Sequence, residues 1–76
     1  MKESVSLEAM IKRWPSALVA REKVGEFSGG VLHPRTMANA DSLGEGPPGR
    51  MKMGRKIFYR AEDLADWIEQ RTEILN

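Results

Sequence analysis

Glycine and proline interrupt this chain so often that none of its helices or strands can be long. Proline lacks the N–H that a helix interior needs, and glycine favours turns with positive φ. The strongest interruptions are Pro15, Gly29-Gly30 and the run Gly44-Glu-Gly-Pro-Pro-Gly49. An isolated helix shorter than about 12 residues is marginal in water, so the segments between these interruptions must pack on one another. With 76 residues, the chain has room for one small domain.

The first segment predicts a short helix over residues 6–14, with Ser6 as its N-cap and Pro15 as its stop. Four apolar residues follow the i, i+3, i+4, i+7 spacing of one helix face: Leu7, Met10, Ile11 and Trp14. A helix this short must dock on something. It therefore either belongs to the core or forms an appendage, residues 1–16, that binds a partner ahead of a main domain at 17–76.

Two further short helices are predicted at 21–28 and 33–42, with the turn Gly29-Gly30 between them. Leu18 precedes the first of them as an apolar staple. In the second, His33 falls at the N-cap and Pro34 at the first helical position, where proline is favoured. Two such helices joined by a short glycine-containing turn are typical of a helix-turn-helix. The polar face of the second helix carries Arg35, Thr36, Asn39 and Ser42.

Residues 50–60 predict a β-hairpin, because polar and apolar residues alternate around Gly54-Arg55. A glycine in the first central position suits a two-residue turn. A last helix is predicted from Ala61, with acidic residues in its first turn. Its buried stripe is Leu64, Trp67, Ile68 and Arg71. The sequence therefore predicts a mainly α fold with a small two-stranded hairpin, a winged helix-turn-helix with roughly three or four short helices.

The net charge of +1 hides an uneven distribution of charge along the chain. Residues 49–60 have no acidic side chain and carry these basic ones: Arg50, Lys52, Arg55, Lys56 and Arg60. Residues 61–76 have Arg71 as their one cation, against the carboxylates Glu62, Asp63, Asp66, Glu69 and Glu73. Clustered cations of this kind are expected on a surface that contacts phosphates. A solvated hairpin whose edge charges keep it soluble is the other interpretation of the same pattern.

Catalytic and metal-binding patterns are absent from the sequence. It contains no cysteine and a single histidine, His33, which excludes disulfides and thiolate zinc sites. No serine or threonine has an evident base, and Gly44-Glu-Gly lacks the lysine of a phosphate-binding loop. We therefore expect neither an enzyme nor a bound cofactor or metal. No apolar run approaches the roughly 18 residues of a membrane span, and the N-terminus is polar, so we expect a cytoplasmic protein without membrane contacts.

Four motifs, in this order, resemble the excisionase-like, MerR-type winged-helix family, which includes phage and prophage excisionases and AlpA-like regulators. They are Gly30-Val-Leu-His-Pro-Arg-Thr-Met-Ala-Asn39, the loop 44–49, Gly54-Arg-Lys-Ile-Phe-Tyr59 and Asp63-Leu-Ala-Asp-Trp-Ile68. The similarity covers residues 18–71 and leaves out the 6–14 helix. This sequence departs from the family at Ala40, where an aromatic residue or leucine is frequent, and at Arg60, which replaces a proline.

The resemblance implies a sequence-specific protein that binds double-stranded DNA, either a prophage-type transcription regulator or an excisionase. It places Arg35, Thr36 and Asn39 on a recognition helix in the major groove. Ser42, on the same polar face, is expected to contact phosphate. The resemblance places Arg50, Lys52, Arg55 and Lys56 on a basic wing along the adjacent backbone or minor groove. Arg60, which departs from the family, is expected to add one more phosphate contact to this wing. The implied partners are DNA and an integrase, a recombinase or RNA polymerase, with cooperative self-association on DNA.

Two other functions remain open at the level of sequence. A protein-interaction adaptor built on the helix-turn-helix scaffold would use the apolar face of the 6–14 helix, with the basic hairpin on an acidic partner. A protein that binds single-stranded nucleic acid would need exposed aromatic residues on which bases stack. Phe58 and Tyr59 are the two candidates, and both are better used in the core or in support of the hairpin.

Overall fold

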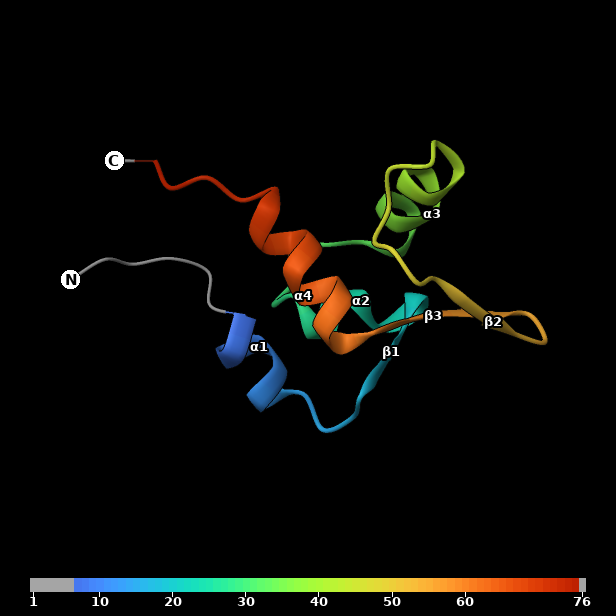
Figure 1. Ribbon diagram of the computed structural model, residues 1–76, viewed down its shortest axis with the longest axis horizontal. Coiled ribbons are helices and arrows are strands. Elements are labelled where there is room, and N and C mark those ends of the chain that lie inside the picture. Colours follow the sequence, from blue (N-terminus) through green and yellow to red (C-terminus); the bar gives the residue numbers. More distant parts are fainter. Residues whose placement is uncertain (1–6, 76) are drawn as a thin grey trace.

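In the computed structural model, which describes residues 7–75, a three-stranded antiparallel sheet has the order β1-β3-β2. The strands are β1 (Leu18–Ala20), β2 (Met51–Met53) and β3 (Lys56–Arg60). The central strand β3 pairs with β1 through Tyr59 opposite Val19, and with β2 through Ile57 opposite Lys52. The β2–β3 hairpin projects from one end of the molecule, on the side away from the first helix, Leu7–Arg13 (Figure 1).

The helices of the described residues surround this sheet. They are α1 (Leu7–Arg13), the 3-10 helix η1 (Arg21–Lys23), α2 (Val24–Phe27), α3 (Pro34–Ser42) and α4 (Ala61–Gln70). α4 follows β3 without a loop and runs away from the hairpin turn, with α1 beside it (Figure 1). None of the helices within residues 7–75 has the length and hydrophobicity needed to cross a membrane.

The core lies where α2, α3 and α4 meet the sheet. Its buried members are Val19, Val24, Phe27, Met37, Tyr59, Ala61, Leu64, Ala65, Trp67 and Ile68. On the side of α1, the ring of Trp14 packs edge-on against Phe27, with 5.4 Å between the ring centroids. The indole Nε1 of Trp14 also donates a hydrogen bond to the Leu18 carbonyl at 2.9 Å. A half-buried indole with its N–H satisfied makes a favourable contribution to such a small core.

α1 is part of this core. Met10, Ile11 and Trp14 are half-buried and pack against the buried cluster, so the apolar face of this helix meets α4 and α2. Three residues of the face that motivated the adaptor hypothesis are therefore partly covered within the chain, and the side chain of the fourth, Leu7, lies outside what the structure describes. Ser6, the expected N-cap of this helix, lies outside the described residues.

Several expected boundaries are confirmed by the structure. α3 begins at Pro34, with His33 at the N-cap, and ends at Ser42. Gly54 has a φ of 62° and is the first of two residues between the paired Met53 and Lys56, which is the two-residue turn that the sequence predicts. The last helix begins at Ala61 as expected.

Two expectations about the region before α3 are wrong. Leu18 is not a staple ahead of a helix but the first residue of β1, so the hairpin is part of a three-stranded sheet and the fold is mixed α/β. The predicted helix at 21–28 is a 3-10 turn, η1, followed by the four-residue α2. β1 is only three residues long, too short for an alternating pattern to appear, and its partner lies about forty residues away in sequence.

Candidate nucleic-acid interface

α3 presents a polar strip to solvent. Arg35, Asn39 and Ser42 are all exposed and follow one another at i+4 and i+3 spacing, so they lie along one side of the helix. Met37 and Asp41 are buried on the other side. Thr36 is exposed as well, but it belongs to a different surface, a groove that it lines together with α4. The structure therefore brings three of the four predicted recognition residues onto one strip and leaves Thr36 at its edge.

The start of α3 is fixed by its own cap. The imidazole Nδ1 of His33 accepts a hydrogen bond from the backbone N–H of Arg35 at 3.1 Å. Pro34, at the first helical position, has no N–H to satisfy. An acceptor on Nδ1 implies that the proton of the neutral imidazole is on Nε2. The cap holds Arg35, the first residue of the polar strip, at a defined place in the helix.

The cations of the hairpin lie on both faces of the sheet. Lys52 is paired with Ile57, so it shares the sheet face of Ile57 and the buried Tyr59. Lys56 and Arg60 alternate with these residues and lie on the opposite face. Arg55 occupies the turn between the two strands. The predicted wing residues thus share one hairpin without sharing one face.

A narrow cleft connects the hairpin turn to the start of α3. Its volume is about 150 Å³, and it is lined by Arg21, Glu22, Pro34, Arg55, Lys56 and Ile57. Pro34 belongs to the first turn of α3, whereas Arg55 and Lys56 follow Gly54 in the hairpin. The two segments that the sequence marks as basic or polar, separated by some twenty residues, therefore border the same cleft.

Three of the five predicted hairpin cations are engaged in ion pairs within the chain. Lys56 Nζ lies 2.7 Å from Glu22 Oε2, with the other carboxylate oxygen at 2.9 Å. Arg60 pairs with Asp63 at 3.4 Å, and Arg50 lies 3.8 Å from Asp41. Within residues 7–75, no ion pair involves Arg35, Lys52 or Arg55, and all three are exposed.

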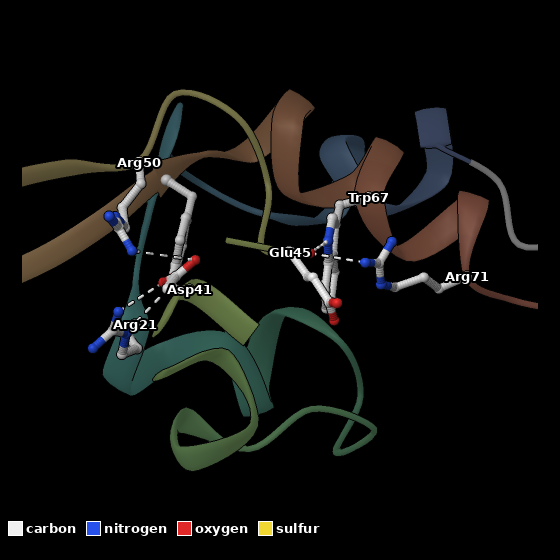
Figure 2. Close-up of polar contacts among 7 residues, drawn as sticks. Arg21, Asp41, Glu45, Arg50, Trp67 and Arg71 are labelled. Carbon is white, nitrogen blue, oxygen red and sulfur yellow. Dashed lines mark hydrogen bonds and ion pairs between the residues drawn. The ribbon is translucent and has the colours of Figure 1, made fainter. Parts of the chain in front are cut away.

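Asp41 is the centre of a buried polar network between α3 and the sheet. Its side chain is only 3% exposed, and its Oδ2 accepts hydrogen bonds from Arg21 at 2.7 Å and from the Tyr59 hydroxyl at 2.6 Å. Arg21 Nε also donates to the Tyr59 hydroxyl oxygen at 3.1 Å. Figure 2 shows the Asp41 carboxylate between the side chains of Arg21 and Arg50. A buried carboxylate is stable only when it is paired and hydrogen-bonded in this way.

The network changes the acid–base properties of its members. Burial, together with the hydrogen bond to Asp41, raises the pKa of Tyr59 to about 12, although Arg21 opposes the shift. Burial lowers the pKa of Arg21, but its hydrogen bonds to Tyr59 and Asp41 outweigh that effect, so the pKa is raised. Outside the network, the hydrogen bond from Lys56, followed by its positive charge, lowers the pKa of Glu22. At neutral pH the tyrosine is therefore protonated and the guanidinium charged.

The loop between α3 and the hairpin is held in place by α4. The carbonyl of Glu45 accepts hydrogen bonds from Trp67 Nε1 at 2.9 Å and from Arg71 at 2.8 Å, as Figure 2 shows. The guanidinium of Arg71 lies over the Trp67 ring, 4.4 Å from its centroid. A Cβ on Gly46 would lie 1.9 Å from Asp41 Oδ1, so the loop passes directly over the network. The part of the connection that follows α3 is thus fixed by the hydrogen bonds of Glu45 and by the close approach of Gly46 to Asp41.

Two residues of this region were missed at the level of sequence. Arg21 falls within the helix predicted at 21–28, and local sequence patterns give no role to Arg21 or to Asp41. The spacing of Asp41 gave a signal, because it lies four residues after Met37 and thus on the same buried face. A carboxylate at such a position requires a cation, and no local pattern identifies which one.

Comparison with protein-family models, with curated proteins and with solved structures gives no match to this chain.

Proposed function

We propose that this protein binds double-stranded DNA as a winged helix-turn-helix, with α3 as the recognition helix and the β2–β3 hairpin as the wing. The observation that carries the proposal is the cleft between Pro34 and Arg55-Lys56, because it gives the start of α3 and the wing turn a common border. A helix in the major groove with a basic hairpin beside it contacts both base edges and the neighbouring backbone.

In this arrangement the exposed strip of α3 reads the DNA sequence. Arg35 can pair bidentately with guanine, and Asn39 with adenine. Ser42, farther along the same strip, and Thr36, at its edge, are suited to contacts with phosphate oxygens. Lys52 and Arg55, which are free of ion pairs within residues 7–75, are the wing cations that reach the backbone or the minor groove without first losing a partner.

The acidic part of the chain supports this orientation. The exposed carboxylates of α4 are Glu62, Asp66 and Glu69. Phosphates repel these side chains, so the binding surface must lie elsewhere. α4 runs from the sheet away from the wing turn (Figure 1), which leaves the wing apart from most of the length of α4.

We further propose that the protein acts as a prophage-type transcription regulator or as an excisionase that assists an integrase or recombinase. Support comes from the ordered motifs between residues 30 and 68 that resemble the excisionase-like, MerR-type family. Sequence-specific binding next to a recombination site or to a promoter is the property that both roles share. Cooperative assembly on DNA and contact with RNA polymerase belong to the same proposal.

A salt titration of DNA binding tests the proposal. Fluorescence anisotropy with a labelled duplex, taken from the DNA upstream of the coding region, should give an affinity that falls steeply with salt. With about four to six phosphate contacts, the slope of log K against log salt should be near −4 to −5. Lys52→Ala should lower both the affinity and the slope. Lys12→Ala, an exposed cation on α1 at the other end of the molecule, is the matched control and should change neither. An affinity that does not depend on salt contradicts the proposal.

A further inference from the structure

We infer that the cleft between α3 and the wing turn is the seat of one DNA backbone phosphate. In the free protein, Glu22 pairs with Lys56, the main cation of this seat, and DNA displaces the Glu22 carboxylate when it binds. This inference rests on the proposed function and adds two residues to it, Arg21 and Glu22, which the sequence did not point to. The cleft combines three cationic side chains with one carboxylate: Arg21, Arg55, Lys56 and Glu22.

Arg21 is the fixed part of this seat. Its Nε is bonded to Tyr59 and one terminal nitrogen to Asp41, so the plane of the guanidinium is held from the inside of the molecule. Its side chain is still 25% exposed, and within the described residues its other terminal nitrogen has no hydrogen-bond partner. A guanidinium has five N–H donors, and a planar fork that is already oriented loses little entropy when it binds a phosphate.

Arg55 and Lys56 are the mobile part of the seat, because both are exposed at the hairpin turn. Arg55 has no ion pair within the described chain, whereas Lys56 is bonded to both carboxylate oxygens of Glu22 at 2.9 and 2.7 Å. More than half of each side chain of this pair is exposed, so the pair is weak and water-accessible. A phosphate that enters the cleft can therefore take Lys56 from Glu22.

The consequence is that Glu22 lowers the affinity for any DNA. In the free protein its carboxylate neutralises Lys56, and in the complex it lies next to the bound phosphate. A competitor of this kind weakens the sequence-independent part of binding, which comes from phosphate contacts, and leaves the base contacts of α3 unchanged. Glu22 thereby lowers specific and non-specific affinity by about the same factor, and the preference for one DNA sequence remains a property of α3.

The test uses Glu22→Gln and a matched control, Glu26→Gln, in the intact chain with a random-sequence duplex. Glu26 is exposed, pairs with Lys23 at 3.8 Å and does not line the cleft. At low salt, Glu22→Gln should raise the affinity about threefold to tenfold, and Glu26→Gln by less than about twofold. In a Lys56→Gln background, the gain from Glu22→Gln should fall to that of Glu26→Gln. These three substitutions lie at exposed positions, so folding is expected to be preserved, and circular dichroism of each variant checks this.

A second measurement reports on Arg21 without any substitution. Its Nε–H is hydrogen-bonded to Tyr59, so its side-chain ¹⁵N signal should be observable and should shift when DNA is added, whereas that of Arg13 on α1 should not. Equal gains from Glu22→Gln and Glu26→Gln, or an unmoved Arg21 signal in a wild-type protein that does bind DNA, overturn the phosphate seat alone. Absence of DNA binding by the wild type and by Glu22→Gln overturns the proposed function together with the seat.

Discussion

The hydroxyl of Tyr59, near the end of β3, donates a 2.6 Å hydrogen bond to Asp41, near the end of α3. This bond joins the helix that we propose for reading DNA to the strand that supports the wing. Arg21, from the segment before α2, bonds to both side chains and closes a triangle. In a chain this small, a satisfied buried network of this kind fixes one packing of α3 on the sheet in a way that apolar contacts alone do not.

Replacing Asp41 with asparagine tests this network. Asp41→Asn keeps the shape of the side chain but leaves Arg21 without its counter-charge, so we expect the free energy of unfolding to fall by about 1–3 kcal/mol. The lower end of that range applies because Arg21 is partly exposed. Urea denaturation measures the change. The control is Asp66→Asn, at an exposed position on α4, which should stay within about 0.5 kcal/mol of wild type. Equal midpoints for both variants would contradict a structural role for Asp41.

The ionisation of Tyr59 gives a pH-dependent readout of the same network. Its pKa is raised to about 12, whereas an unfolded tyrosine titrates near pH 10. Stability due to the protonated phenol is therefore fully present below pH 10 and is lost as the pH rises toward 12. Tyr59 is the single tyrosine of the chain, so tyrosinate absorbance follows this one group. We expect a midpoint near pH 12 in the folded protein and near pH 10 in urea. Coinciding midpoints would show that the phenol is not held by Asp41.

Gly46 sets how closely the loop passes over Asp41. A Cβ at this position would lie 1.9 Å from Asp41 Oδ1, so Gly46→Ala forces the carboxylate away from its partners. We expect a loss of about 2 kcal/mol or more in the free energy of unfolding, because the clash both disturbs the hydrogen bonds of Asp41 and strains the loop. Gly44→Ala is the matched control, because its Cβ would meet nothing within 4 Å and its positive φ of 74° costs only about 1 kcal/mol. Thermal denaturation of both variants measures the difference, and a larger loss for Gly44→Ala would refute the close approach.

Local patterns in the sequence predicted the elements whose signals are local. The Pro34 start of α3, the Gly54 turn and the start of α4 each depend on residues within one helical turn of the boundary, and all three were placed correctly. β1 was missed because three residues carry no periodicity, and its register with β3 arises from packing across the whole chain. Prediction from sequence is therefore reliable here for boundaries and weak for pairings.

The same division holds for the candidate interface. The cluster of charge at residues 49–60 and the polar strip of α3 were visible in the sequence, because both are contiguous or helically spaced. The sequence did not show which of these cations form ion pairs within the folded chain. The pairing of Lys56 with Glu22 depends on where η1 lies beside the hairpin, and the pairing of Arg21 with Asp41 joins two segments twenty residues apart. Such partners follow from the tertiary structure alone.

The N-cap of α3 should make a measurable contribution to the free energy of unfolding. His33→Ala removes the acceptor for the Arg35 N–H, so one helix-end donor loses its partner. We expect a loss of about 1 kcal/mol in the free energy of unfolding. His33→Asn restores a short side-chain acceptor that is favoured at this position and should recover most of the loss. If alanine and asparagine give the same stability in urea titrations, the Nδ1 contact does not contribute to the folded state.

A selection from random DNA should distinguish the residues that contact bases from the residues that contact the phosphate backbone. Asn39→Ala and Arg35→Ala remove side chains from the exposed strip of α3, so each should relax the preference at one base pair by about 1–3 kcal/mol. Lys52→Ala removes a wing cation that has no ion pair within residues 7–75, so it should weaken binding to all sequences and reduce the salt slope by about 1. Sequencing of the bound pools measures the preference, and salt titrations measure the slope. If Lys52→Ala changes the selected sequence while Asn39→Ala does not, α3 is not the element that reads the bases.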